Sequence, residues 1–339
     1  MVRLNLGLKN REPTVVAGQQ LNRGFHQMFE EGHLTLGVFF PIEAFEGAVP
    51  IMEGQVELAQ RAEALGFSAL WFRDVPLRIP SFGDTGQVYD PFVYLGFIAA
   101  QTKSIALATG SIVLSLRHPL HVAKAAASVD QLSGGRLVMG VGTGDRPEEF
   151  PAFDRQHASR TETFRESLRL IELAYREEYP DYRSSFGRMV GGSAGVLPKP
   201  VAGRVPIMIT GRARQKLEWT AAHCDAWVKY SRTPERQEVV IESWREALKR
   251  SCRGQFKPFG QSLYIDLAED PNEGPSDIHL GFRFGRHALI ELLGQLRELG
   301  VNHVTFTLKY SKRPAADVLE ELGAEVVPLF AARTISPGA

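Results

Sequence analysis

The chain has 339 residues, enough for two average domains or for one (β/α)8 barrel. Its 39 basic residues (Lys and Arg) balance its 39 acidic residues (Asp and Glu), and charged residues make up 23% of the chain. This neutral composition excludes wholesale disorder and argues against nucleic acid or a membrane as a partner. Two cysteines, Cys224 and Cys252, are too few for a disulfide framework or a four-cysteine zinc site, so a reducing, cytoplasmic compartment is expected.

The N-terminal segment, residues 1–33, is predicted to be an irregular arm that packs on the fold or on a neighbouring subunit. It lacks the uninterrupted apolar core of a signal peptide. No apolar run in the chain approaches the roughly 20 residues of a membrane span.

Strand-like apolar runs and amphipathic helical runs alternate from residue 34 onwards. The predicted strands cover residues 34–40, 68–72, 105–114, 136–141, 205–210, 226–230, 262–268 and 303–308. The predicted helices cover residues 52–65, 92–102, 121–132, 159–176, 215–224, 233–250 and 286–299, with a last helix from Pro314. Ser159 and Glu162 have the spacing of a capping box at the start of the fourth helix.

Alternating strands and helices indicate an α/β protein with parallel strands and right-handed crossovers. Eight such units without a break at the midpoint close most economically into a TIM barrel, predicted here as one domain over residues 34–332. A doubly wound open sheet is the alternative.

In a TIM barrel the chemistry lies where the strands end at their C-termini. The predicted strand ends carry glycines and hydroxyl groups, with neither a His-x-His pair for metal nor two carboxylates for glycoside cleavage. These residue types suit a flat, anionic cofactor held by backbone N–H groups and hydroxyls, and no metal. The candidate cofactor-binding residues at these ends are Thr109, Gly110, Ser111, Gly142, Thr143, Gly144, Thr210, Gly211 and Arg212.

Two of these clusters also have a plainer interpretation. The glycines from Gly140 to Gly144 are spaced GxGxG, a weak dinucleotide fingerprint, and Gly140 and Gly142 would also relieve crowding inside a barrel. Thr210–Arg212 is either an anion-binding site at the start of a helix or an ordinary turn with a solvated arginine.

Three ordered blocks of sequence carry a resemblance to a known family. The most specific runs from the His118-Pro119 step through Ser-Val-Asp-Gln-Leu-Ser-Gly-Gly to Arg136 and the fourth strand. The others are Arg160…Phe164-Arg-Glu166, and Val-Pro-Ile-Met-Ile-Thr-Gly over 205–211 followed by Ala-Ala-His-Cys-Asp-Ala-Trp over 221–227. Over about residues 34–332 the chain resembles the luciferase-like flavin-dependent monooxygenases and oxidoreductases.

The resemblance implies a TIM barrel that binds FMN, or in some branches F420, at the C-terminal face. It implies phosphate contacts from Arg160 and Thr161, and a non-prolyl cis peptide at Gly110–Ser111, for which a β-bulge is the alternative. The chain departs from the family pattern after the second strand (Arg73-Asp74 instead of Glu-His) and after the fifth (Thr210-Gly-Arg-Ala instead of Gly-Gly-Ser-Ser). No catalytic residue is therefore assigned.

The expected function is that of an FMN-dependent oxidoreductase, a two-component monooxygenase that uses reduced flavin and O2 on a small organic substrate. A separate flavin reductase is the expected partner, and the chain is expected to form a homodimer or a higher homo-oligomer. An F420-dependent dehydrogenase and a flavin-binding protein without turnover are the alternatives. The long segment Glu269–Phe284 is a candidate lid, with a disordered surface loop as the alternative.

Overall fold

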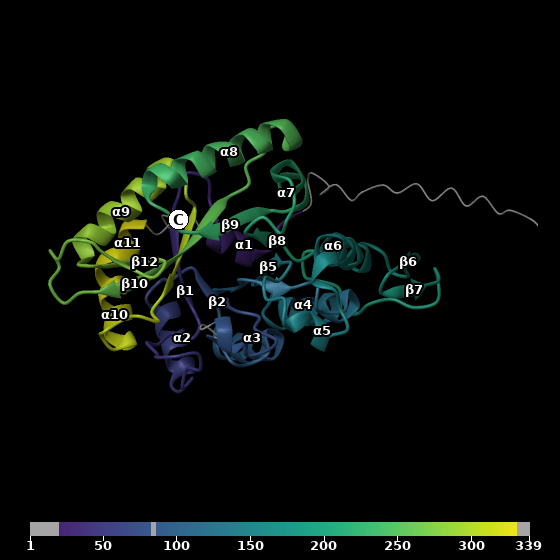
Figure 1. Cartoon of the computed structure of the whole chain (residues 1–339), viewed down its shortest axis with the longest axis horizontal. Coiled ribbons are helices and arrows are strands. Elements are labelled where there is room, and N and C mark those ends of the chain that lie inside the picture. The colour runs from purple at the N-terminus through teal and green to yellow at the C-terminus, as the bar shows by residue number, and fades with distance from the viewer. Residues whose placement is uncertain (1–19, 83–85, 331–339) are drawn as a thin grey trace, which may run out of the picture.

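Eight parallel strands close into a barrel in the computed structural model, which describes residues 20–82 and 86–330 (Figure 1). In chain order they are β1 (Thr35–Phe39), β2 (Ala69–Phe72), β3 (Ala106–Thr109), β5 (Leu137–Gly142), β8 (Ile207–Thr210), β9 (Ala226–Tyr230), β10 (Phe259–Leu267) and β13 (His303–Thr307). Each pairs in parallel with its neighbour, and β13 pairs with β1 to complete the ring. This closure confirms the predicted TIM barrel and excludes the open sheet.

Helices cover the outside of the barrel. The main ones are α2 (Gln55–Ala64), α3 (Pro91–Gln101), α4 (Pro119–Leu132), α6 (Arg160–Arg176), α7 (Leu217–His223), α8 (Pro234–Cys252), α9 (Arg286–Leu299) and α10 (Ala315–Glu321). Shorter turns are η1 (Pro80–Phe82), α5 (Glu149–Ala152), η2 (His157–Ser159), η3 (Leu322–Val326) and α11 (Val327–Phe330). No helix in the described part of the chain is long and apolar enough to cross a membrane.

The alternation of side chains along each strand separates two cores. On β1, Leu36 and Val38 pack outward against the helices, whereas Phe39 joins the core inside the barrel. Small residues, including Ala69 on the same strand and Ala108 on the neighbouring β3, make room in that inner core for Trp71.

The predicted irregular arm contains a helix that closes the lower end of the barrel. In α1 (Arg23–Met28), Phe25 and Met28 are buried against the inner core, as is Phe29 just after the helix. Residues 23–28 are thus helical rather than irregular, and they pack on the chain's own barrel. The rest of the arm, residues 1–19, and the predicted domain end at 332 lie outside the described residues.

A buried histidine joins α1 to the barrel. Burial lowers the pKa of His303 to about 3, so its ring is neutral. Its Nε2 accepts a hydrogen bond from the Trp71 indole (2.9 Å), which leaves Nδ1–H to donate to the Thr35 hydroxyl (2.8 Å). Thr35 in turn donates to the carbonyl of Met28 (2.5 Å). The hydrogen-bond chain thus runs from the inner core to the end of α1.

The third strand is shorter than predicted. β3 ends at Thr109, the Gly110–Ser111 peptide is cis, and β4 (Ile112–Val113) then pairs with β5. The cis peptide expected from the family resemblance is therefore present, and it divides the single strand predicted over 105–114.

Two segments inserted between the β/α units form hairpins. The first is β6 (Tyr182–Ser184) with β7 (Gly187–Met189), which projects from the body of the molecule in Figure 1. The second is β11 (Ser276–Ile278) with β12 (Gly281–Phe284), and β12 pairs in parallel with β10. The candidate lid is therefore an ordered extension of the barrel sheet rather than a disordered loop.

The predicted capping box is wrong. The 3-10 turn η2 immediately precedes α6, so Ser159 has a near-helical backbone (φ −89°, ψ 3°) instead of the extended one that a capping residue needs. Its hydroxyl donates to the carbonyl of Gln156 instead (3.1 Å).

Arg136 is a buried cation with an extensive set of hydrogen bonds. Its guanidinium donates to the carbonyl oxygens of Ala99 (2.8 Å), Thr102 (3.1 Å), Ile105 (3.0 Å) and Ser133 (3.0 Å), and to the Thr102 hydroxyl (2.9 Å). One side chain thus joins the end of α3, the start of β3 and the end of α4.

Glu172 on α6 gives the fold a testable pH dependence. Burial raises its pKa to about 7, although the nearby Arg204, which pairs with Asp225, favours the ionised form. Because glutamate ordinarily titrates near 4.5, this group favours the folded state most below pH 4.5, and that contribution is lost as the pH rises through 7.

Glu172→Gln is therefore expected to raise the free energy of unfolding by about 1–3 kcal/mol at pH 8 and by clearly less at pH 5. Urea unfolding at the two pH values measures this difference. Glu162→Gln, at an exposed position of the same helix, is the control. An effect of Glu172→Gln that is equal at both pH values would contradict the prediction.

Candidate functional site

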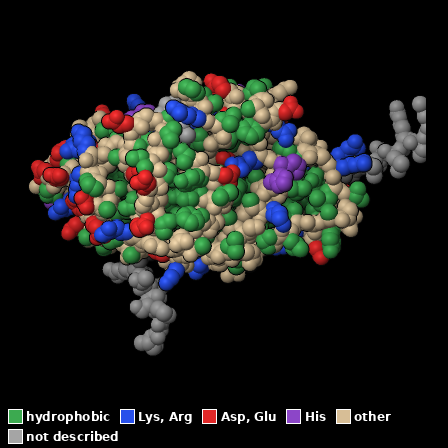
Figure 2. Space-filling model, turned by 90° about the horizontal axis from the view of Figure 1, so that it is seen from below, with side chains coloured by type: hydrophobic (Ala, Val, Ile, Leu, Met, Phe, Trp, Pro, Cys, Tyr) green, Lys and Arg blue, Asp and Glu red, His purple; other side chains and the backbone are tan. Residues whose placement is uncertain are grey.

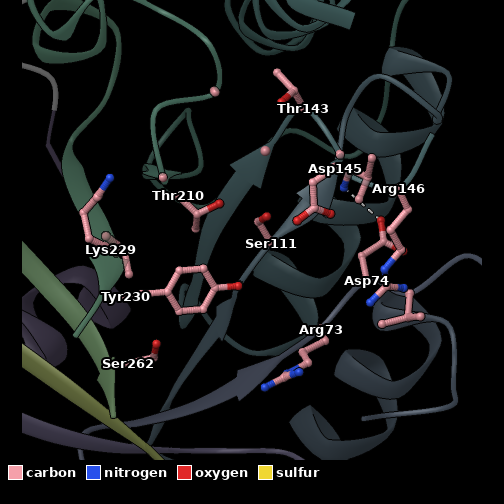
Figure 3. A pocket seen from close by; sticks show the side chains of 18 of the residues that line it. Arg73, Asp74, Ser111, Thr143, Asp145, Arg146, Thr210, Lys229, Tyr230 and Ser262 are labelled. Carbon is pink, nitrogen blue, oxygen red and sulfur yellow. Dashed lines mark hydrogen bonds between the residues drawn. The ribbon is translucent and has the colours of Figure 1, made fainter. Parts of the chain in front are cut away.

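A cavity of about 680 Å³ opens at the carboxyl ends of the barrel strands (Figure 3). Its wall takes residues from β1, β2, β5, β8, β9 and β10, from the turn after β3, and from the tip of the β11–β12 hairpin. This is the face where a TIM barrel carries its chemistry.

The structure brings most of the predicted cofactor-binding residues together in this wall. Gly110, Ser111, Gly142, Thr143, Gly144, Thr210, Gly211 and Arg212 all line the cavity. In Figure 3, the side chains of Ser111 and Thr210 point into it from neighbouring parts of the sheet.

Three predicted residues lie outside the cavity wall. Thr109 is fully buried, and its hydroxyl donates to the carbonyl of Gly140 (2.8 Å), which is a structural contact. Arg160 donates to the carbonyl of His157, and the carbonyl of Thr161 accepts from the Gln215 side chain (3.3 Å). A role for Arg160 and Thr161 in phosphate binding stays a prediction.

Gly140 and Gly142 serve different needs. A Cβ at Gly140 would lie 1.8 Å from the carbonyl oxygen of Thr109, so this glycine is required by packing inside the barrel. A Cβ at Gly142 would lie 2.7 Å from the Ser111 hydroxyl and 3.3 Å from the Thr210 hydroxyl. Gly142 therefore keeps that part of the cavity floor flat and leaves both hydroxyls accessible.

Positive charge gathers on the β8 side of the cavity. Arg212 and Arg214 are exposed on the turn after β8, and Lys229 lies on the adjacent β9. Burial lowers the pKa of Lys229, and the Arg232 and Arg212 charges lower it further; burial and the Arg214 charge do the same to Arg160. Lys229 thus lies within electrostatic reach of Arg212, and Arg160 within reach of Arg214, so an anion on this side of the cavity would be stabilised.

The opposite wall is aromatic. Arg73 donates to the hydroxyl of Tyr264 (2.8 Å) and lies over the ring of Phe39 (5.3 Å). The ring of Tyr264 also contacts His279, on the hairpin tip, and Tyr310, with ring centroids 6.0 and 5.6 Å away. The tip of the candidate lid therefore contributes to the cavity, while its movement as a lid stays a prediction.

The third side of the cavity carries carboxylates. Asp74 binds Arg117 through two hydrogen bonds (2.8 Å each) and accepts from the backbone of Val113 (3.0 Å), so its role there is structural. Glu149 is 1% exposed, and burial raises its pKa. A buried carboxyl in a cavity wall with a raised pKa is a candidate proton carrier.

Sequence reasoning missed Lys229, Tyr264, His279 and Glu149, all of which line the cavity. Tyr264 lies within an apolar strand, and His279 lies in an insertion without a strand pattern. The three clusters that the sequence indicated, at the ends of β3, β5 and β8, are those in which glycine and hydroxyl residues follow an apolar strand.

No group of three or more His, Cys, Asp or Glu residues in the described ranges is placed to hold a metal ion. His118 caps the start of α4, because its ring accepts a hydrogen bond from the backbone N–H of Leu120 (3.3 Å).

Comparison with known proteins identifies the family. The model of the luciferase-like monooxygenase family matches residues 34–291. The chain belongs to the luciferase-like monooxygenase family. A curated relative, the alkanal monooxygenase beta chain of Photorhabdus luminescens, is 30% identical over 191 residues, which are 56% of this chain and 54% of the relative.

Solved structures share the fold of this luciferase-like chain. Monooxygenase RslO1 from Streptomyces bottropensis has a TM-score of 0.71 at 20% identity, covering 88% of this chain and all of that one. An FMN complex of the oxygenating constituent of 3,6-diketocamphane monooxygenase from Pseudomonas putida has a TM-score of 0.69 at 16% identity, with 87% and 98% covered. An F420-dependent secondary alcohol dehydrogenase has a TM-score of 0.67 at 16% identity, with 85% and 97% covered. The TM-scores show that these proteins and this chain have a common fold.

Proposed function

We propose that this luciferase-like monooxygenase is FMN-dependent and works as the oxygenating component of a two-component system. The observation that carries the proposal is a single cavity with a flat glycine floor, a cation cluster on one side and an aromatic wall on the other. The FMN complex of a structural neighbour that is itself an oxygenating constituent supports it.

The residues present fit a flavin mononucleotide. Thr210, Gly211, Arg212 and Arg214 would hold the phosphate dianion through hydroxyl, backbone and guanidinium donors. Gly142 and the Gly110–Ser111 peptide would form the floor beneath the ring system. The aromatic wall would then enclose a small organic substrate.

When bound, reduced flavin supplies the electrons that activate O2. The chain's own residues orient the two reactants and exclude water: Phe39 and Trp71 give the cavity an apolar base, and Leu280 reaches into it from the hairpin tip. Glu149 is positioned in the wall to hold or release a proton. A separate flavin reductase would supply the reduced flavin.

A binding titration tests the cofactor. Flavin fluorescence during titration of the purified chain is expected to show tight binding of FMN and reduced FMN, and much weaker binding of riboflavin, because the cation cluster needs the phosphate. O2-dependent turnover should require reduced FMN and be unaffected by chelators. Tight binding of F420 with turnover in the absence of oxygen would overturn the FMN assignment and favour an F420-dependent dehydrogenase.

Gly142→Ala tests the cavity floor. The added methyl group would displace the Ser111 hydroxyl, which can rotate, so the protein is expected to fold normally. FMN affinity is expected to fall about tenfold, because the ring would lose its close approach to the backbone. Gly294→Ala on α9, where a Cβ meets nothing within 4 Å, is the control. Unchanged FMN affinity in Gly142→Ala would place the ring elsewhere.

A further inference from the structure

Among the described residues that line the cavity, His279 is the one histidine. It lies next to Leu280 at the tip of the β11–β12 hairpin. Successive residues of a regular strand point to opposite faces. At the tip, however, Leu280 has a left-handed backbone (φ 57°), and His279 and Leu280 both line the cavity. A left-handed conformation is disfavoured for leucine, and such residues cluster at functional sites.

The hairpin tip is tied closely to the barrel. The carbonyl of Leu280 accepts hydrogen bonds from the Ser231 hydroxyl (3.2 Å) and from the backbone N–H of Tyr264 (3.3 Å). A Cβ at Gly281 would lie 1.8 Å from the carbonyl oxygen of Tyr264, so glycine is required for the tip to approach β10 this closely. The backbone that carries His279 therefore has a defined position in the cavity wall.

Ion pairs hold the base of the same hairpin. Arg283 on β12 pairs with Asp266 on β10 (2.8 Å) and with Glu273 (2.7 Å). Figure 2 shows acidic and basic side chains intermixed at the end of the molecule where Figure 1 places β12, α9 and α10. The hairpin is thus anchored at its base as well as at its tip.

Two tyrosine rings set the orientation of the His279 imidazole. The rings of Tyr264 and Tyr310 lie edge-on to it, with centroid distances of 6.0 Å and interplanar angles of 77° and 79°. The cations on this wall are Arg73, which donates to the Tyr264 hydroxyl (2.8 Å), and Lys309, whose ammonium lies over the Tyr310 ring (5.7 Å). These four side chains are the titratable and charged groups that face the imidazole.

The imidazole is available to a ligand. Within the described ranges, neither ring nitrogen of His279 forms a hydrogen bond or an ion pair, and the residue is exposed at the cavity. Histidine is the side chain best suited to exchange a proton near neutral pH. An aromatic wall favours a flat aromatic ligand, and an accessible base within that wall favours a ligand with an acidic O–H group. A phenol combines both properties.

We propose that His279 is a catalytic base of this chain and that the substrate is a phenol, an inference that rests on the proposed function for its oxygenation step. An imidazole nitrogen accepts the proton of the phenol O–H, and the electron pair left on the oxygen raises the electron density of the aromatic ring. The O–O bond breaks: one oxygen atom inserts into a C–H bond of the ring to give C–O–H, and the other leaves as water. The two electrons and two protons that balance this step come from reduced FMN, and His279 returns its proton to the product.

Ionisation of 4-nitrophenol on the full, FMN-loaded chain tests the base, because the phenolate of this probe is yellow and its neutral form is nearly colourless. At pH 6 the neutral form dominates in solution. Binding is expected to raise the ratio of phenolate to phenol at least about tenfold, because the proton moves to His279 and a charge-assisted hydrogen bond forms. Difference absorption spectra against the same chain without the probe measure this ratio.

His279→Gln keeps a hydrogen-bonding side chain that cannot take up the proton, so it should return the ratio to its value in free solution. The variant should fold normally, because His279 is exposed. His26→Gln, at an exposed position of α1, is the matched control and should behave as the wild type. An unchanged ratio in His279→Gln, or no binding of 4-nitrophenol to the wild type, would overturn the proposal.

The same titration on the chain without FMN separates this proposal from the cofactor assignment. If His279-dependent ionisation persists but FMN does not bind, the base and the phenol class stand and the FMN-dependence is wrong. If FMN binds tightly but the ratio does not respond to His279→Gln, the base is wrong and the cofactor assignment stands.

Discussion

Arg212→Ala is expected to weaken FMN binding by about ten- to a hundredfold, or about 1.5–3 kcal/mol, because a charge-assisted contact with the phosphate is lost. Arg212 is exposed at the cavity rim, on the turn after β8, and makes no contribution to the core. The variant should therefore keep its stability, so the loss of affinity reports on the ligand alone. Flavin fluorescence titration measures the dissociation constant.

Comparing the binding of riboflavin with that of FMN distinguishes a lost phosphate contact from any other effect of Arg212→Ala. Riboflavin lacks the phosphate, so Arg212→Ala should leave its weak binding unchanged. Arg236→Ala, on the exposed face of α8, controls for a change in net charge. Equal loss of affinity for FMN and riboflavin would show that Arg212 acts on the ring system, and an unchanged FMN affinity would remove it from the site.

Arg136→Met is expected to lower the free energy of unfolding by about 3–5 kcal/mol. Methionine fills a similar length but donates no hydrogen bond, so the carbonyl groups of Ala99, Thr102, Ile105 and Ser133 would lose a buried donor. Urea unfolding followed by far-UV circular dichroism gives the change.

Arg236→Met provides the matched control, because it makes the same replacement at an exposed position and should change the stability by less than about 0.5 kcal/mol. If Arg136→Met were equally mild, water would have to satisfy the freed carbonyl groups, and Arg136 would not be needed to join α3, β3 and α4.

The repeating part of the architecture could be predicted from sequence. Every predicted strand overlaps an observed barrel strand, because buried parallel strands and amphipathic helices have distinct hydrophobic periods. The break after Thr109 could not be inferred from periodicity, since the apolar pattern continues from Ile105 to Leu114 across the cis peptide. It was the family resemblance that indicated it.

Features that depend on distant contacts were harder to predict. The six residues of α1 are too few to be stable alone, and the helix exists because Phe25 and Met28 fill the lower end of the barrel. Likewise, Lys229 and Tyr264 lie in strands, and only closure of the barrel turns them toward one cavity. The glycine and hydroxyl residues of the site could be predicted from the sequence because they stand at the ends of predicted strands.

The helix that closes the lower end of the barrel has a consequence for ligand traffic. Below the cavity the interior is filled by the stacked rings of Trp71 and His303, and beneath them by Phe25, Met28 and Phe29. Ligands therefore enter and leave by the upper rim. On the proposed arrangement, with FMN on the glycine floor and the substrate above it, the cofactor would bind before the substrate, and the product would leave before the cofactor is exchanged. Steady-state kinetics of this chain should accordingly follow a compulsory order, with excess substrate trapping the cofactor already bound.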